Sequence, residues 1–391
     1  MSREVPDGWS VKPLGKIADL IMGQSPPSSA VTEAGDGLPF IQGNAEFGAR
    51  HPTPRFVAST TPKVVRAGDV LISVRAPVGE VNIAEGPLCI GRGVGGIRAK
   101  ECEPDFLFYA VAGLSRTFSR LSQGSTFDAI NGKELREIRI LLPPLEEQRR
   151  IAEVLRSLDE AIGSSRAMAE AARKTSQTMR HELLGVTRDG DLGDIPAGWL
   201  IQPLEALATV ERGKFSVRPR NDPRFFGGRT PFIQTGDITA AGDYLSSHTQ
   251  TLNELGVTVS RVFPAGTIMT TIAANIGDFT ISTYPVACPD SVVGIEPHDG
   301  VNVFWLYSVL SCFKVALDRA ATQNAQKNIN LQTLRPLLIP VPPPNLMTEL
   351  SESLKAAADI ARNANTNVRQ LESLKIAVMD DLLSGRIRVP A

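Results

Sequence analysis

The stretch LEEQRRIAEVLRSLDEAIGSSRAMAEAARKTSQTMRHELLG, residues 145–185, predicts one long helix with a continuous apolar seam. It contains no proline and is rich in Ala, Leu, Glu and Arg. Apolar or small residues recur along it at alternating spacings of four and three, as in the seam of a coiled coil. They are Ile151, Leu155, Leu158, Ile162, Ser165, Ala169, Ala172, Ser176, Met179 and Leu183. The small residues in the middle would let a partner helix approach closely.

A second stretch of the same character, residues 346–384, is the expected partner. Its seam runs through Leu350, Leu354, Ala357, Ala361, Ala364, Val368 and Leu371, and then skips one step to Leu374, Val378 and Leu382. The skip predicts a local register shift. At about 1.5 Å per residue each helix is about 60 Å long, and each seam is exposed unless the other covers it. We therefore predict that the two helices pair; two separate surface helices, each packed on its own domain, are the alternative.

The rest of the chain is an internal duplication. The opening DGWSVKPLGKIADLIMG (7–23) returns as AGWLIQPLEALATVERG (197–213), and PFIQ occurs at both 39–42 and 231–234. Later segments repeat in the same order, and the last of them ends in Pro-Pro before each long helix. The period is too long for a solenoid, so the sequence predicts a pair of similar domains.

Each repeat has the pattern of an α/β or α+β domain. We expect a short helix at 12–22 and 202–212, then short Val/Ile/Thr-rich strands separated by Gly, Pro and Asn turns. A helical stretch (105–121; 302–318) and a last strand (137–142; 336–341) follow. The predicted boundaries are 1–144 and 186–343 for the two domains, and 145–185 and 344–391 for the helices.

Composition restricts the function further. The 391 residues exceed one ordinary domain, and 42% hydrophobic content excludes a disordered chain. Lys plus Arg number 41 against 42 Asp plus Glu, so contact with nucleic acid must come from local patches or from a partner's charge. Four widely separated cysteines suit buried thiols in a reducing cytosol. No membrane-spanning run or signal peptide is recognisable, so we expect a soluble cytoplasmic protein.

Motifs of catalysis are missing from the sequence. None of the Gly-Lys pairs is followed by the Ser or Thr of a phosphate-binding loop, and no double proline lies in the Asn/Asp-Pro-Pro-Tyr/Phe tetrad of adenine methyltransferases. The stretch Gly91–Gly96 fits G-x-G-x-x-G, but no helix pattern follows it, so a glycine-rich turn is the better interpretation. The four histidines are isolated and not at metal-ligand spacing. We predict no catalytic residue, no metal and no cofactor on this chain.

These features together resemble the specificity (S) subunit of type I restriction-modification systems, over nearly the whole chain. The resemblance rests on the two Gly-Trp…Pro-Leu openings, the two Pro-Phe-Ile strands, the junction LLPPLEEQRRIAEVLRSLDEAI at 141–162 and the ending LLSGRIRV at 382–389. The second junction, VPPPNLMTELSESL, departs from it because it lacks the acidic-Gln-Arg sequence after the prolines.

The resemblance implies a division of labour. Each globular repeat would be a target recognition domain that reads one half of a split sequence in double-stranded DNA, and the helices would form an antiparallel coiled coil that spaces the two domains. Two methyltransferase subunits would dock on the helices, and restriction subunits could join them. S-adenosylmethionine, ATP and Mg²⁺ would then be bound by those partners, and the S subunit itself would catalyse nothing.

A comparison of the repeats yields candidates for DNA contact. Shared positions are expected to be structural; Asn131 and Asn330, for example, are expected to cap turns. Polar loop positions that differ are expected to read bases, since Arg and Lys pair well with guanine, and Asn and Gln with adenine. The candidates are Gln24, Ser25, Gln42, Asn44, Arg75, Ser125, Thr126 and Lys133 in the first repeat, and Lys214, Arg218, Arg220, Gln234, Thr235, Asp237, Asn275, Gln323, Asn324, Lys327 and Asn328 in the second.

Three other interpretations remain open from the sequence. One is a stand-alone methyltransferase, which labelled-methyl transfer by the isolated chain would test. A specificity subunit of a modification-only or type IIB-like complex would have the same sequence features. A structural coiled-coil adaptor with two protein-binding heads belongs to a different class, and it would select no split motif from random DNA.

Overall fold

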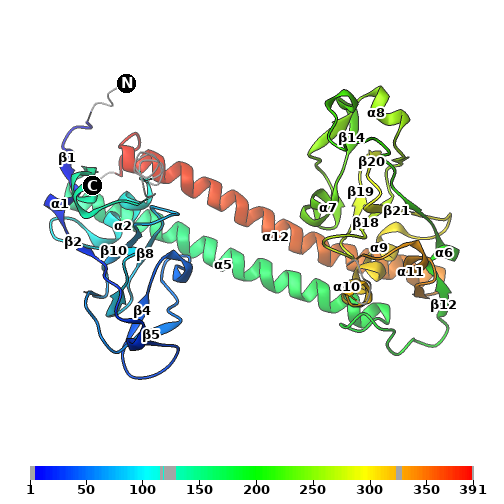
Figure 1. Ribbon diagram of the computed structural model, residues 1–391, viewed down its shortest axis with the longest axis horizontal. Coiled ribbons are helices and arrows are strands. Elements are labelled where there is room, and N and C mark those ends of the chain that lie inside the picture. The colour runs from blue at the N-terminus through cyan, green and yellow to red at the C-terminus, as the bar shows by residue number, and fades with distance from the viewer. Residues whose placement is uncertain (1–4, 115–117, 119–128, 323–327, 390–391) are drawn as a thin grey trace. The chain divides into compact units, whose positions relative to one another are not determined.

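The structure is a computed structural model that describes residues 5–114, 118, 129–322 and 328–389 (Figure 1). The chain separates into two compact units. Unit 1 consists of Met1–Ser164 and Val368–Ala391, and unit 2 of Ser165–Asn367. Each unit therefore combines one sequence repeat with a segment of both long helices.

The described residues of unit 1 form two sheets and a two-stranded ribbon. The main sheet is antiparallel and has the order β2 (Ala18–Met22), β10 (Val94–Ala99), β7 (Val70–Ser73), β8 (Val81–Ile83). The second has the order β3 (Val31–Thr32), β5 (Phe56–Ala58), β4 (Leu38–Ile41), β9 (Leu88–Ile90), β6 (Val64–Val65), with β4 and β9 parallel. The ribbon pairs β1 (Ser10–Pro13) with β11 (Arg139–Leu142).

Unit 2 repeats this plan. Its main sheet has the order β13 (Ala208–Arg212), β21 (Val292–Pro297), β18 (Ile268–Thr271), β19 (Phe279–Ser282), β15 (Tyr244–Leu245). The second has the order β16 (Gln250–Leu252), β14 (Phe226–Phe232), β20 (Val286–Ala287), β17 (Val262–Phe263). The ribbon pairs β12 (Leu200–Pro203) with β22 (Leu338–Val341).

A glycine shared by the repeats sets the distance between the two sheets of each unit. A Cβ added to Gly96 of β10 would lie 2.5 Å from Val65 Cγ1 in β6, and one added to Gly294 of β21 would lie 2.4 Å from the Phe263 ring in β17. A side chain at either position would push the sheets apart.

Several of the short helices begin at a side-chain cap. In unit 1, α2 (Pro104–Ala112) is capped by Glu103 and α4 (Gly132–Glu137) by Asn131. In unit 2, α9 (Val303–Cys312) and α11 (Leu331–Leu334) are capped by Asn302 and Asn330. The capping roles predicted for Asn131 and Asn330 are thus confirmed. The remaining short α-helices of the described residues are α1 (Leu14–Ile17), α6 (Leu204–Leu207), α7 (Thr235–Ala241), α8 (Glu254–Thr258) and α10 (Lys314–Thr322).

The prediction of a helix at 12–22 and 202–212 is wrong. Each segment contains a single helical turn, α1 (Leu14–Ile17) or α6, with a strand on either side. Leu14 and Ile17 are fully buried, and their spacing of three suits one turn. The residues after the turn pair with β10 or β21 instead of continuing the helix, because strand pairing in the sheet outweighs a short helical pattern.

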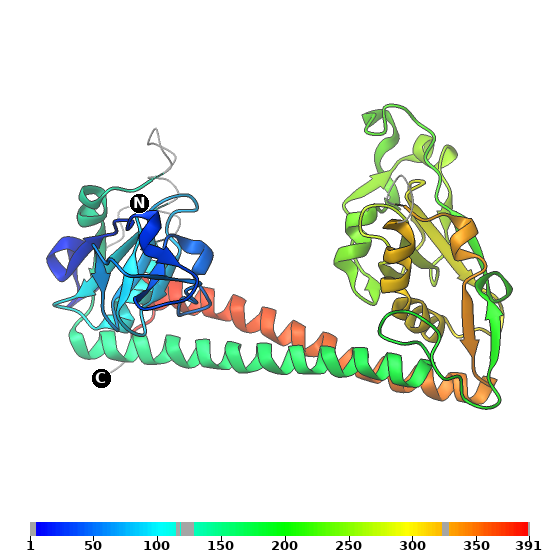
Figure 2. The same ribbon diagram turned by 60° about the horizontal axis from the view of Figure 1, so that its bottom comes forward.

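The long helices α5 (Leu145–Leu184) and α12 (Pro344–Ser384) pack together, as predicted (Figures 1 and 2). In unit 1, Leu155 of α5 and Leu382 of α12 belong to one apolar core; in unit 2, Leu184 and Leu354 do. In unit 1, Asp159 also pairs with Lys375, and Glu147 pairs with Arg388 just after the end of α12, so the two segments run antiparallel. Among the seam residues, Ile151, Leu155, Ile162, Leu354 and Val368 are buried, and Leu158, Leu350 and Leu371 are half-buried.

The predicted register shift after Leu371 is wrong. Leu374 is 49% exposed, and the buried positions of α12 continue at intervals of seven through Leu354, Ala361, Val368 and Leu382. Lys375 occupies the remaining position of that series and is half-buried. Its ammonium group lies 2.5 Å from the Asp159 carboxylate of α5, which allows a lysine to take a place that the apolar pattern assigned to leucine.

Among the described residues, no helix combines the length and the apolar character needed to cross a membrane.

Candidate nucleic-acid interface

The first cluster of candidate residues in unit 1 forms where β2 and β4 end. The Gln24 N–H donates to the Ile90 carbonyl (3.0 Å), and Ser25 Oγ donates to Gln42 Oε1 (3.1 Å). The Arg92 N–H donates to Ser25 Oγ at 3.3 Å. The structure therefore brings Gln24, Ser25 and Gln42 together, although they come from different segments.

The glycine-rich stretch forms the turn beneath this cluster. A Cβ on Gly91 would lie 2.6 Å from Gln42 Oε1, and one on Gly93 would lie 2.5 Å from the Gln42 carbonyl oxygen. The turn between β9 and β10 can approach Gln42 only because these residues are glycines. This geometry also places Arg92 at the cluster. Arg92 was not among the candidates predicted from the sequence, although its position inside the G-x-G-x-x-G pattern could have indicated it.

The other candidates of unit 1 are distributed around the ends of β7 and β8. Asn44 Nδ2 donates to Glu80 Oε2 (3.0 Å), so this amide is already engaged. Arg75 is exposed and forms a β-bridge with Ala129, and Lys133 is exposed on the first turn of α4. Ser125 and Thr126 lie outside the described residues.

Unit 2 has a cluster at the equivalent place, after β13 and beside the turn that precedes β21. Lys214 and Arg218 are exposed there. The Arg220 guanidinium donates to both carboxylate oxygens of Asp290 (2.9 and 3.2 Å), so it is held by a turn residue. The loop after β2 in unit 1 thus carries polar, uncharged candidates, whereas the loop after β13 in unit 2 carries basic ones.

Gln234, Thr235 and Asp237 line a pocket of about 550 Å³ at the start of α7. Gln234 Nε2 donates to Gln250 Oε1 at 2.7 Å. The Asp237 carboxylate accepts from the Gln234 N–H (2.7 Å) and from Thr249 Oγ1 (3.2 Å), so it closes the helix cap. Sequence reasoning missed Thr249 and Gln250. Gln250 pairs with Phe232 of β14 as Phe56 pairs with Phe40 of β4, but the sequences of these two segments do not match.

The last candidates of unit 2 lie at the loop after β18. Asn275 is exposed, and its Nδ2 donates to Thr239 Oγ1 (3.2 Å). Asn328 forms a β-bridge with Ala273, as Ala129 does with Arg75 in unit 1. Gln323, Asn324 and Lys327 lie outside the described residues.

These clusters offer hydrogen-bond donors and acceptors but no arrangement for acid–base or metal chemistry. Among residues 5–114, 118, 129–322 and 328–389, no group of three or more His, Cys, Asp or Glu side chains could hold a metal ion. Burial raises the pKa of the Cys102 thiol to about 11 and that of Cys312 to about 12, so both stay protonated and unreactive at neutral pH. The arrangement suits recognition of a polar surface such as the edges of base pairs.

Comparison with known proteins gives the family. Residues 6–170 and 196–372 each match the type I restriction modification DNA specificity domain. Three specificity subunits of type I restriction enzymes from Methanocaldococcus jannaschii are similar. MjaX is 45% identical over 46% of this chain and 44% of that protein, MjaIX is 22% identical over 99% and 95%, and MjaVIII is 24% identical over 98% and 94%.

Two solved structures have the same fold. The type I S subunit from M. genitalium has a TM-score of 0.61 at 15% identity and covers 97% of both chains. A chain from a study of assembly and conformational transition of the type I R-M system has a TM-score of 0.62 at 21% identity, over 98% of this chain and 100% of that one.

The chain therefore belongs to the type I restriction-modification DNA specificity family, and it carries the family's domain twice. Its function is that of the DNA specificity subunit of such a system, which is a non-catalytic subunit.

Proposed function

We propose that each repeat reads one half of a split sequence in double-stranded DNA. The observation that supports this most is the polar cluster repeated at equivalent strand ends with different side chains. Gln24 in unit 1 stands where Lys214 stands in unit 2, and the loop that follows carries Ser25 in unit 1 but Arg218 in unit 2. A shared scaffold with different donors and acceptors is what two different half-sites require.

The target recognition domains are proposed at 1–144 and 186–343, with α5 and α12 as the spacer between them. Two methyltransferase subunits dock on the helices, and restriction subunits join that complex. S-adenosylmethionine, ATP and Mg²⁺ belong to those partners. The net charge of −1 supports this division, because phosphate contacts must then come largely from the partner subunits. The proposed location is the cytoplasm, which suits the four buried, free cysteines.

The test changes one cluster at a time in the full chain, expressed with its methyltransferase. Replacement of residues 24–29, or the triple variant Gln24→Ala, Ser25→Ala, Gln42→Ala, should make the first half-site degenerate and leave the second intact. Each lost bidentate contact removes about 1–3 kcal/mol of discrimination. Lys214→Ala with Arg218→Ala should have the converse effect.

Sequencing of methylated bases in the host genome gives both half-sites in one measurement. Lys12→Ala serves as a control, since Lys12 pairs with Glu101 at 3.2 Å, away from the cluster. A motif that stays unchanged in both cluster variants, or a wild-type motif that is not split, would contradict the proposed division of reading.

A further inference from the structure

Two tyrosines that correspond in the repeats stand at the centre of a polar network in their own unit. Tyr109 of α2 donates from its hydroxyl to Asp159 Oδ2, and Tyr307 of α9 donates to Asp243 Oδ1, both at 2.7 Å. The rings are 0% and 4% exposed. Burial raises the pKa of both phenols, which keeps them protonated as donors at neutral pH.

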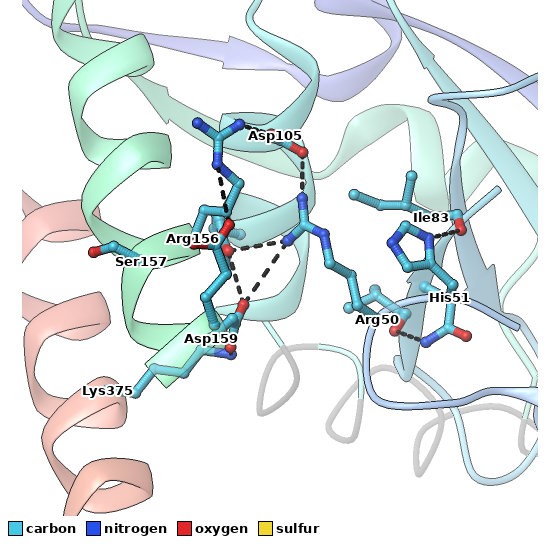
Figure 3. A network of polar contacts seen from close by, with 12 residues as sticks. Arg50, His51, Ile83, Asp105, Arg156, Ser157, Asp159 and Lys375 are labelled. Carbon is cyan, nitrogen blue, oxygen red and sulfur yellow. Dashed lines mark hydrogen bonds and ion pairs between the residues drawn. The ribbon is translucent and has the colours of Figure 1, made fainter. Parts of the chain in front are cut away.

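In unit 1 the recognition domain supplies the cation that bonds the tyrosine, Arg50, and it also supplies a carboxylate, Asp105, which lies 3.3 Å from Arg156 of α5 (Figure 3). Arg50 Nη1 donates to the Tyr109 hydroxyl (3.0 Å) and lies 3.8 Å from the Asp159 carboxylate. Its other terminal nitrogen bonds Asp105. Asp159 belongs to α5, and Lys375 of α12 reaches it as well. A network of charges therefore joins the domain to both helix segments.

In unit 2 the recognition domain supplies the anion. Asp243 Oδ1 accepts from Arg180 Nη2 of α5 at 2.6 Å as well as from Tyr307. The Arg180 guanidinium also lies 5.2 Å from the centre of the Tyr307 ring. The side chains of Arg180 and Asp243 are only 13% and 19% exposed, so solvent screens this pair weakly.

Arg50 and Asp243 occupy the same position of the fold, although the sequence around them does not match. The Ile83 N–H donates to the Arg50 carbonyl at 2.8 Å, and the Ile281 N–H donates to the Asp243 carbonyl at 2.9 Å. Ile83 and Ile281 are corresponding residues of the repeats, in β8 and β19. One backbone position therefore carries a cation in unit 1 and an anion in unit 2. In each unit α5 supplies a partner of the opposite charge, Asp159 or Arg180.

This position also closes a candidate reading segment. Arg50 ends the segment that starts at Gln42, and Asp243 ends the one that starts at Gln234. In unit 1 the segment is fixed further by the buried Asn82, whose side chain bonds both the N–H and the carbonyl of Gly48 at 3.0 Å.

We propose that Arg50 and Asp243 are positioning residues that hold the reading segment of each unit on its helix segments, and that their opposite charges make the two docking sites non-interchangeable. Arg50 would meet Arg180, and Asp243 would meet Asp159, if the domains exchanged sites. Like charges at such a buried site oppose docking. This inference rests on the proposed reading of one half-site by each unit.

The test uses the full chain with its methyltransferase and three variants of unit 2. Asp243→Arg and Arg180→Asp each place like charges beside Tyr307. The double variant restores the pair with the polarity of unit 1. We expect each single variant to reduce methylation by about tenfold or more and to relax the bases read at the second half-site, while the first half-site stays intact. The double variant should restore the motif.

Several outcomes overturn the inference. The first is a single variant whose motif is identical to the wild-type motif at both halves. The second is a uniform loss of methylation with lowered thermal stability but no change of motif. The third is a double variant that does not restore the motif. Tyr307→Phe keeps the ion pair and the fold and should relax the second half-site partially; an unchanged motif would also count against the inference. Asp299→Arg, a charge reversal at an exposed residue of unit 2 outside both long helices and the candidate reading segments, is the control. A wild-type motif that is not split would instead refute the proposed function.

Discussion

Glu147, at the first turn of α5, connects segments from the beginning and the end of the described chain. Its carboxylate accepts from Trp9 Nε1 (3.0 Å) and from Arg388 Nε and Nη2 (2.6 and 2.8 Å). Arg388 also lies 5.5 Å from the Trp9 ring centre. The corresponding position of the second repeat is Leu346. The acidic residue after the first Pro-Pro is therefore explained by the Arg388 that it binds.

The Glu147 carboxylate should give unit 1 a pH-dependent stability. The hydrogen bonds from Arg388, and then from Trp9, hold the pKa of Glu147 below its ordinary value. The stabilisation is thus complete above the pKa of the unfolded chain and disappears as the pH falls through the lower, folded value.

Glu147→Gln should lower stability by about 1–2 kcal/mol at pH 7, since the half-exposed Arg388 weakens a charged hydrogen bond of about 1.5–3 kcal/mol. The difference from wild type should shrink as the pH falls below the ordinary pKa of a glutamate carboxyl. Thermal unfolding across this range measures it. Glu146→Gln, on the exposed side of the same turn, should change little, and an effect equal to that of Glu147→Gln would contradict the assignment.

At the scale of elements, the paired helices were predictable because their signal is long and periodic. The exception, Leu374, shows what the pattern omits. Hydropathy placed Leu374 in the seam, but the unbroken interval of seven runs through Lys375, whose charge is balanced by Asp159 from the other helix. A contact between residues that far apart in sequence leaves no trace in local periodicity.

Two alanine substitutions on α12 test this register. Leu382→Ala should cost about 2–5 kcal/mol, because Leu382 is 4% exposed and its removal leaves a cavity. Leu374→Ala should stay within about 0.5 kcal/mol, as surface substitutions do. Chemical denaturation of the two variants gives the comparison. Equal losses of stability in the two variants would support the register shift that the sequence predicted.

The candidate interface was predictable only in part. The comparison of repeats correctly identified shared residues such as Asn131 and Asn330 as caps, because a cap depends on neighbours within three positions. It did not find Arg92 or Gln250, which approach the clusters through contacts between distant strands. The correspondence between Arg50 and Asp243 was not predicted either. The two residues share a backbone position in the fold, but their side chains have opposite charges, so a comparison of the sequences does not pair them.

At the scale of the whole molecule, the helices belong to both units, since α5 and α12 each contribute to unit 1 and to unit 2. The proposed spacer role predicts the effect of shortening them together. Deletion of residues 163–169 and 361–367 removes one heptad from each helix and preserves the interval of seven.

Both half-sites should survive this deletion, while the gap between them should shrink. Seven helical residues span about 10 Å, and base pairs are about 3.4 Å apart, so the gap should lose up to about three base pairs. Methylome sequencing measures the gap and the bases together. A change in the bases read, with the gap unaltered, would be incompatible with a spacer role.

The assignment of residues after Val368 to unit 1 also sets an order of events during translation. The sequence of unit 2, Ser165–Asn367, has been synthesised before the segment that covers Leu155 and binds Glu147 is made. The nascent first repeat must therefore wait, with this part of α5 uncovered, while the second repeat is synthesised and can fold. A ribosome that stalls between the two Pro-rich junctions would hold a chain whose first unit is incomplete. The time between synthesis of the two junctions is therefore the period in which the first unit is most exposed to chaperones and proteases.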